Sequence, residues 1–264
     1  MPELAEVEFY RKQWDAGLGA QILGVELHGE KRLFHQTDFR QLQRRLTGAA
    51  LLSSEAHGKQ MLFRFSSGTW LGLHLGMTGK LRVDRPDLPP GKHDHLVLYQ
   101  QPRSLVFSDP RLFGRVRFHQ GPAAPDWWAH LPPELSSAAF TLQLMCAFLQ
   151  RHRQAPIKTV LLLQSGFPGV GNWMADEILW RARLHPQTPA GRIENTTLPR
   201  LWRSVKLVCR GAMRSIAREL EDPPKHWLFH QRWDGKGHCP QDGTPLRRAT
   251  IGGRTTAWCP RCQE

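Results

Sequence analysis

The 264-residue sequence has no long hydrophobic run. Its longest apolar stretches fall far short of the roughly 20 residues that a membrane helix needs. The first eight residues, MPELAEVE, are acidic and lack the basic start and apolar stretch of a secretory signal. These absences predict a cytoplasmic protein with no membrane partner, associated with the nucleoid if it binds DNA.

Cysteine is also scarce. The chain has five cysteines, and three of them (Cys239, Cys259 and Cys262) fall within the last 26 residues. An odd number in a chain without a signal sequence argues against a disulfide framework, and the local cluster predicts a metal site. The sequence has no His-Glu-x-x-His motif, so a zinc-dependent hydrolase is the least supported class.

Acidic residues are outnumbered by basic ones. The 36 Lys and Arg residues against 23 Asp and Glu residues give a net charge of +13. Such an excess favours a polyanionic partner, of which nucleic acid is the commonest. A basic protein that binds nothing, or one that associates with an anionic membrane, is the alternative.

The apolar pattern changes period along the chain. Residues 1–16 can form a short amphipathic helix. Short alternating strands at 62–65, 70–75, 96–99 and 116–118, separated by turn residues, predict a β-sandwich. After a linker at 120–133, a 3.6-residue period predicts helices at 141–153, with Thr141 as N-cap, and at 157–164, 173–183 and 198–221.

These patterns predict an α+β multidomain protein. The expected domains are a β-sandwich over residues 1–122, a helical domain over 130–222 and a zinc-finger-like β-hairpin over 236–264. In the helical part, Gly166-Phe167-Pro168-Gly169-Val170-Gly171-Asn172 joins two helices and places Asn172 near a helix N-terminus, which can bind an anion. An ordinary helix connection with an Asn cap is the alternative.

Two short pairs of potential ligands lie near the C-terminus. Cys239-x2-Asp242 and Cys259-x2-Cys262 are separated by 16 residues, a hairpin-length spacing found in zinc modules. Because structural zinc prefers sulfur and imidazole, His238 is an alternative fourth ligand, and loss of zinc is the other possibility. Between the pairs, Arg254 follows two glycines at the expected tip, where its guanidinium can reach a phosphate.

Taken as a set, several segments resemble one family. They occur in the family's order over nearly the whole chain and are Pro2-Glu3-Leu4-Ala5-Glu6-Val7-Glu8, His74-Leu75-Gly76-Met77-Thr78-Gly79, Lys92-His93-Asp94-His95, Asp109-Pro110-Arg111-Leu112-Phe113-Gly114, Gly169-Val170-Gly171-Asn172 with Ala175-Asp176-Glu177, and Gly253-Arg254-Thr255-Thr256 through Gln263. The sequence is similar to the formamidopyrimidine-DNA glycosylase/endonuclease VIII superfamily, closer to the first branch.

The resemblance implies a bifunctional DNA glycosylase and AP lyase of base excision repair. Once Met1 is removed, Pro2 would be a secondary amine that forms a Schiff base with the damaged nucleotide, and its reference pKa near ~8 leaves a neutral fraction at physiological pH. Glu3 would be the general acid or base. Lys59 would contact a phosphate and assist elimination, and Arg254 would bind phosphate and assist the second elimination.

The partner implied is damaged double-stranded DNA, bound by a monomer. The damaged base must leave the stack, and Met77, Arg111 and Phe113 match the residues that fill the vacated space. Core packing is the alternative for Met77 and Phe113. The residues that match DNA-backbone contacts are His93, Arg153, Lys158 and Asn172.

The sequence departs from the family at several positions. Ala5 replaces a proline, Leu112 stands where a second arginine is common, and Asp242 replaces a zinc cysteine. Residues 220–227 do not resemble the loop that covers oxidised purines, so the preferred lesion stays open among oxidised purines, oxidised pyrimidines, ring-opened bases and crosslinks. A non-catalytic nucleic-acid-binding protein, in which Met1 blocks Pro2, is the competing hypothesis.

Overall fold

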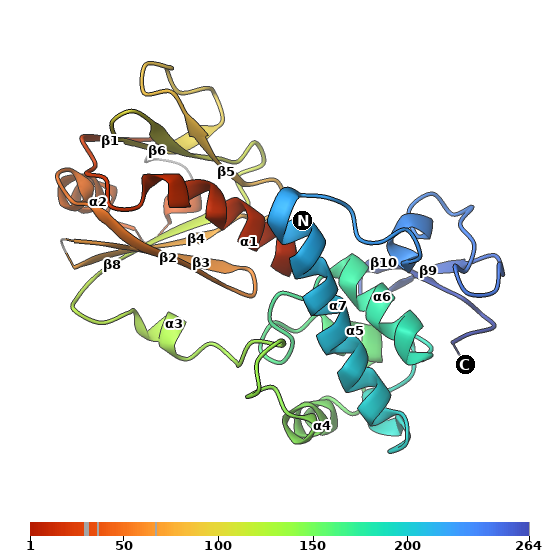
Figure 1. The fold of residues 1–264 in the computed structure, drawn as a ribbon. Coiled ribbons are helices and arrows are strands. Elements are labelled where there is room, and N and C mark those ends of the chain that lie inside the picture. Colours follow the sequence, from red (N-terminus) through yellow and green to blue (C-terminus); the bar gives the residue numbers. More distant parts are fainter. Residues whose placement is uncertain (29–31, 36, 67, 264) are drawn as a thin grey trace. The chain divides into compact units, whose positions relative to one another are not determined.

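The computed structural model describes residues 1–28, 32–35, 37–66 and 68–263. The chain forms two compact units. Unit 1 comprises residues 1–2 and 6–131, and unit 2 comprises residues 3–5 and 132–264. The predicted α+β class, with N-terminal sheets, a helical region and a C-terminal β-hairpin, is confirmed (Figure 1).

Unit 1 contains two antiparallel four-stranded sheets. One has the order β2-β3-β4-β8, formed by Leu51–His57, Gln60–Phe65, Thr69–His74 and Arg115–Gln120. The other has the order β1-β6-β7-β5, formed by Gly24–Leu27, Asp94–Tyr99, Ser104–Ser108 and Lys80–Asp84. Phe63 and Leu71 from the first sheet and Leu96 and Phe107 from the second share one buried core. The four predicted strands coincide with β3, β4, β6 and β8, and the shared core makes the pair of sheets a β-sandwich.

In the described part of unit 1, three α-helices accompany these strands. The predicted N-terminal helix is α1 (Leu4–Gln13), which a 3-10 turn, η1 (Trp14–Gly17), extends. Helix α2 (Phe39–Leu46) was not predicted, although Asp38 caps it by accepting a hydrogen bond from the Gln41 N–H at 3.0 Å. The segment expected to be a linker contains a short helix, α3 (Asp126–Ala129). A second 3-10 turn, η2, spans Arg32–Phe34.

Unit 2 is helical and ends in a hairpin. Its helices are α4 (Leu142–Arg151), α5 (Ile157–Leu161), α6 (Asn172–Ala182) and α7 (Leu198–Glu219), with 3-10 turns η3 (Ala190–Arg192) and η4 (Leu228–Gln231). Thr141 caps α4 as predicted, accepting from the Leu144 N–H at 3.1 Å. Strands β9 (Arg247–Ile251) and β10 (Arg254–Trp258) form the hairpin.

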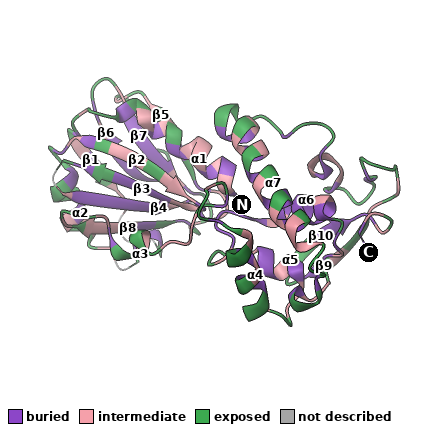
Figure 2. Ribbon diagram, turned by 60° about the horizontal axis from the view of Figure 1, so that its bottom comes forward, coloured by how far each residue is buried: buried purple, intermediate pink, exposed green. Residues whose placement is uncertain are grey.

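Helix α6 lies at the centre of unit 2. All of its residues from Trp173 to Trp180 are buried, and Figure 2 shows the helix coloured as buried over most of its length. It packs against α7 through a second hydrophobic core that includes Met174, Ile178 and Val205. Among the described helices, none combines the length and apolar character needed to cross a membrane.

Candidate active site and metal centre

The carboxylate of Glu3 is buried at the N-terminus of α6. The side chain is 3% exposed. Its Oε2 accepts hydrogen bonds from the backbone N–H groups of Gly171 at 2.9 Å and Met174 at 3.2 Å, and its Oε1 accepts from Trp173 at 3.0 Å. The first turn of a helix has N–H groups without partners within the helix, and its dipole stabilises negative charge. An acidic side chain far away in sequence therefore completes this helix end.

Gly171 allows Glu3 to approach the helix. A Cβ at position 171 would lie 2.2 Å from the Glu3 Cδ atom, well inside van der Waals contact. The φ of Gly171 is −125°, so the glycine is needed for space and not for its backbone conformation. The Leu4 N–H also donates to the Gly169 carbonyl at 3.0 Å, which holds residues 3–5 on the same turn.

A buried ionic cluster joins α6 to three other segments of unit 2. Asp176 on α6 accepts hydrogen bonds from the Lys158 ammonium of α5, from the Arg232 guanidinium at 2.6 and 2.9 Å, and from the backbone N–H of Ala257 in β10 at 3.2 Å. Lys158 also donates to the Asn172 carbonyl at 2.7 Å. Asp176 therefore holds the hairpin against the helices.

This cluster corrects the role expected for Lys158. Its side chain is 0% exposed and its ammonium is bonded to Asp176 and Asn172. A direct phosphate contact needs an exposed ammonium, and this one instead fixes the start of α6. Burial lowers the pKa of Lys158, and the Asp176 carboxylate opposes that effect. Arg153, predicted to contact the DNA backbone, is exposed.

The hairpin tip is anchored beside the N-terminus of α6. The Asn172 side-chain amide donates to the Thr255 carbonyl at 2.8 Å. A Cβ on Gly252 would lie 2.4 Å from the Thr159 Oγ1 atom, so the tip lies close to α5. Arg254 begins β10 and is exposed. The structure thus brings Asn172, Glu3 and the residue next to Arg254 to the same end of α6.

Unit 1 presents two adjoining loops. The Asp109 carboxylate accepts hydrogen bonds from the Thr78 hydroxyl at 2.7 Å, the Gly114 N–H at 2.7 Å and the Arg111 N–H at 3.3 Å. It thereby fixes the loop that carries Met77 to the loop that carries Arg111 and Phe113. Gly76 has a φ of +60°, and a Cβ there would lie 2.3 Å from the Phe113 carbonyl carbon.

These loops expose the side chains predicted to open the duplex. Phe113 is 46% exposed, and the Arg111 guanidinium lies 4.9 Å from the centre of its ring. Met77 is half-buried. Core packing is therefore excluded as the reason for Phe113. His93 is exposed, and its carbonyl accepts from the Asp109 N–H at 2.9 Å, which places it beside the same loops.

Lys59 lies in the turn between β2 and β3 and is half-buried, as is Pro2. The neighbouring His74 is neutral at physiological pH, because burial and then the positive charges of Lys59, Arg115 and Arg117 lower its pKa to about 4. Its Nδ1 accepts a hydrogen bond from the Gly76 N–H at 3.0 Å. This part of unit 1 is therefore strongly positive.

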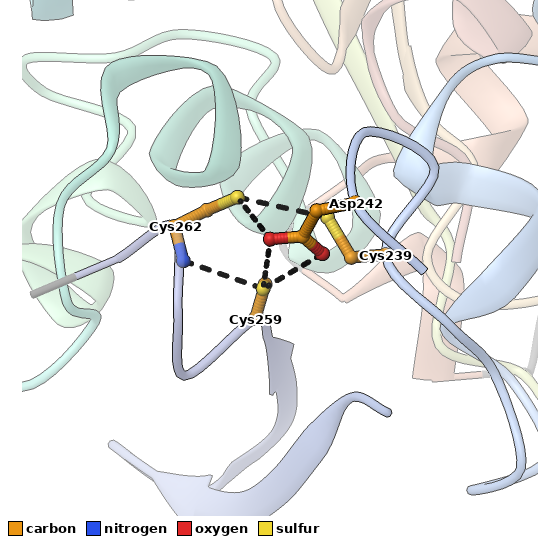
Figure 3. A group of neighbouring side chains, drawn as sticks. All are labelled: Cys239, Asp242, Cys259 and Cys262. Carbon is orange, nitrogen blue, oxygen red and sulfur yellow. Dashed lines mark hydrogen bonds between the residues drawn. The ribbon is translucent and has the colours of Figure 1, made fainter. Parts of the chain in front are cut away.

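Four residues of the C-terminal hairpin form a compact donor set (Figure 3). The ligand atoms of Cys239, Asp242, Cys259 and Cys262 all lie within 4.8 Å of one another. The Sγ atoms of Cys239 and Cys262 are 3.7 Å apart. Tetrahedral zinc with Zn–S bonds of roughly 2.3 Å needs sulfurs roughly 3.8 Å apart, so these residues could hold a metal ion.

Asp242, and not His238, belongs to this set. A hydrogen bond from the Thr244 N–H, 3.0 Å long, lowers the pKa of Asp242 below its usual value and keeps it a carboxylate. His238 is exposed and lies outside the group. The indole N–H of Trp180 donates to the Cys239 sulfur at 3.3 Å, which ties the set to α6.

Three residues of this architecture were quoted in the sequence motifs without a role. They are Asp109, Gly171 and Asp176, whose contacts join segments 31 to 168 positions apart. The two aspartates carry no local sequence signal for these roles, because their burial and their partners are visible only in the structure.

The β-sandwich, the two helices joined by a glycine-rich turn and the four-ligand hairpin define a protein of the helix–two-turn–helix class. Comparison with known sequences agrees. Residues 1–116 match the formamidopyrimidine-DNA glycosylase N-terminal domain, and residues 131–221 match the formamidopyrimidine-DNA glycosylase H2TH domain.

Relatives match the chain over its full length. Formamidopyrimidine-DNA glycosylases of Xanthomonas axonopodis pv. citri and Geotalea uraniireducens are each 36% identical, with all of both chains covered. A Lactococcus lactis enzyme of this name, solved with DNA containing an AP site, is 27% identical with a TM-score of 0.87 and 99% of both chains covered. MutM solved with DNA containing carbocyclic 8-oxo-G is 28% identical with a TM-score of 0.89 and full coverage.

The chain belongs to the formamidopyrimidine-DNA glycosylase family. It is a DNA glycosylase, and therefore a hydrolase, of DNA repair.

Proposed function

We propose that this glycosylase is bifunctional, releasing a damaged base from duplex DNA and then nicking the strand as an AP lyase. The nucleophile is the amine of Pro2 after removal of Met1. The observation that carries the proposal is the Glu3 carboxylate, which is buried and held by three backbone N–H groups directly after Pro2 in the chain.

The chemistry follows from these two residues. The neutral Pro2 nitrogen forms a bond to the sugar C1′ atom as the bond from C1′ to the damaged base breaks, and the base leaves with a proton. The C1′–ring oxygen bond then opens, and the nitrogen electrons form the iminium of the Schiff base. Glu3 exchanges protons with the sugar oxygen in this step. Loss of a C2′ proton expels the 3′ phosphate, and water releases Pro2.

The other proposed residues hold the substrate. Lys59 contacts a phosphate near the lesion and assists elimination, and Arg254 binds phosphate from the exposed hairpin tip. His93 and Arg153 are exposed, as backbone contacts must be, and Asn172 lies at a helix N-terminus that favours anions. Met77, Arg111 and Phe113 fill the space that the extruded base leaves.

Damaged double-stranded DNA is the proposed substrate. The structural relatives include proteins solved with an AP site and with an 8-oxoguanine analogue in DNA, which supports this class. The expected lesions are oxidised or ring-opened bases. The segment from Leu220 to η4 is tied to α6 through the Phe229 N–H, which donates to Glu177 at 3.2 Å, so a long covering loop is not part of the proposed site.

The metal proposed for the hairpin is one structural zinc ion. The donor spacing fits a tetrahedral ion, and three sulfurs with one carboxylate are within the range of ligands that zinc accepts. Zinc would cross-link the two ends of the hairpin and so support the position of Arg254.

Borohydride trapping tests the proposal. Protein of verified N-terminal mass is mixed with a duplex that carries one abasic site, and reduction should yield a covalent protein–DNA adduct. Pro2→Gly should weaken or slow that adduct. No adduct from protein that lacks Met1 and still binds the duplex would favour the competing function, a non-catalytic protein that binds damaged DNA.

A further inference from the structure

A hollow lined by arginines lies in unit 2 and takes no part in the chemistry above. Two pockets of about 350 and 540 Å³ share Arg183, Arg200 and Gln241. Together they are lined by five guanidinium groups, and we call this feature the arginine pocket. Its arginines come from the end of α6, the start of α7 and the hairpin, and are Arg181, Arg183, Arg200, Arg203 and Arg261.

Most of this positive charge is not neutralised. Arg181 forms an ion pair with Glu177 at 2.7 Å. Across the described part of the chain, no ion pair joins a carboxylate to any of the other four arginines. Like charges held this close together repel one another, which raises the free energy of the folded protein unless an anion binds among them.

The negative charge of the neighbouring metal site would balance only part of the positive charge of these arginines. Asp242 and Cys262 line the larger pocket. A divalent ion held by three thiolates and one carboxylate carries two net negative charges. Four unpaired guanidinium groups exceed that by two, so electrostatic support of the hairpin is not a sufficient reason for the pocket.

The pocket is separate from the phosphate contacts proposed above. Arg183 lies eleven residues after Asn172, and helix geometry puts roughly 16 Å between them. The hairpin runs along α6 in the same sense, because Thr255 bonds to Asn172, Ala257 to Asp176, and Cys239 to Trp180. Arg254 thus lies at one end of α6 and the arginine pocket at the other.

We propose that the arginine pocket binds backbone phosphates of DNA outside the stretch held by Asn172 and Arg254. The inference rests on the proposed function, because damaged duplex DNA is what brings phosphates to this surface. Guanidinium groups bind phosphate oxygens in pairs and are preferred for this purpose. Charge complementarity between these guanidinium groups and a polyanionic duplex is the reason for choosing this occupant. Free nucleotides or pyrophosphate share this chemistry and are the alternative source.

A charge-matched pair of variants tests the assignment. Arg200→Gln/Arg203→Gln removes two charges from the pocket, and Arg210→Gln/Arg214→Gln removes two exposed charges from the same helix outside it. Affinity for an undamaged duplex of about 30 base pairs is measured between about 50 and 200 mM salt. The pocket variant should bind about tenfold more weakly at low salt, with a salt slope reduced by roughly two.

The control variant should change both quantities much less. Equal losses in the two variants would mean diffuse attraction and overturn the proposal. Unchanged duplex binding, with calorimetric binding of pyrophosphate lost in the pocket variant, would assign the pocket to a free phosphorylated compound and overturn its role in DNA binding. The single variant Arg200→Gln is also prepared, and its melting temperature is compared with that of the parent protein. Equal melting temperatures show that a loss of binding does not come from misfolding.

The assay is independent of catalysis because it uses undamaged DNA. If no adduct formed in the borohydride experiment, the lyase proposal would be refuted, but the duplex affinities of the two variants would still test the arginine pocket. Conversely, a protein that traps normally but shows no difference between the two variants would refute only the arginine pocket.

Discussion

A single methyl group at position 171 would reach the Glu3 carboxylate, which is proposed to act in catalysis. In Gly171→Ala the new Cβ would lie 2.2 Å from the Glu3 Cδ atom, so Glu3 must move away from the N-terminus of α6. A displacement of about 1 Å at a catalytic group costs roughly 100-fold in rate. We expect single-turnover excision to fall by about that factor, while the affinity for duplex with an abasic-site analogue changes little.

Gly24→Ala is the matched control, because the only atom near its new Cβ would be a Tyr99 carbon at 3.6 Å. This variant should excise at the parent rate. An unimpaired Gly171→Ala would show that Glu3 is not needed in its observed place, and the assigned role would then be wrong.

Asp109 is a positioning residue for the two loops of unit 1. In Asp109→Asn, an NH2 group replaces one of the two carboxylate oxygens. This NH2 donor would face the Thr78 hydroxyl or the Gly114 N–H, which both donate to the carboxylate in the parent protein. An unsatisfied buried group costs about 1–3 kcal/mol. We expect a lower melting temperature and weaker binding of lesion duplex. Asp87→Asn, at an exposed side chain, should change neither. If binding stayed normal in Asp109→Asn, the loops would not depend on this clamp.

At the scale of elements, the C-terminal hairpin allows the metal to be tested. Asp242→Cys would supply a fourth thiolate, which structural zinc prefers to a carboxylate. We expect the variant to retain zinc against a chelator concentration that strips the parent protein, and Asp242→Ala to lose it more readily. Zinc content and the melting temperature give two readouts, since the Trp180 indole N–H bonds to Cys239 and so ties the site to α6. Equal zinc content and affinity in all three proteins would remove Asp242 from the ligand set.

Elements with a local signal were predictable from the sequence. Thr141 followed by an apolar helical period identified α4, and alternation over residues 62–65 and 96–99 identified β3 and β6. Helix α2 has only two buried residues, Leu42 and Leu46, among several charged ones, so its apolar stripe is too short to predict a helix by itself. Asp38 at its start was the available signal.

The site was only partly predictable, because its supporting contacts are not local. The motif around Pro2 and Glu3 suggested the chemistry that is proposed, and the glycine-rich turn predicted Asn172 near a helix N-terminus, where α6 begins. Nothing in the sequence indicates that Glu3 bonds to Gly171, 168 positions away, or that Asp176 buries the charge of Lys158. Lysine is usually exposed, so a phosphate contact was the natural expectation for Lys158.

At the scale of the whole molecule, two titratable groups, one buried and one half-buried, make stability depend on pH in opposite directions. Burial raises the pKa of Glu177 in unit 2 to about 7, although Arg181 opposes the shift. The folded state then binds the proton more tightly, so stability present below the unfolded pKa of about 4.5 is lost as pH rises to about 7. For His74 in unit 1, whose pKa is lowered to about 4, stability present above about pH 6.5 is lost as pH falls.

Each effect amounts to at most about 3.4 kcal/mol at 1.36 kcal/mol per pKa unit, so the two nearly offset each other in the parent protein between about pH 4.5 and 6.5. Replacing one of the two groups should therefore reveal the pH dependence of stability that the other group contributes. Glu177→Gln should gain stability relative to the parent as pH rises from 5 to 7.5, whereas His74→Asn should gain relative stability as pH falls. Melting temperatures across this range check both signs. Parallel curves for the parent and Glu177→Gln would mean that Glu177 stays ionised beside Arg181, and the raised pKa would be wrong.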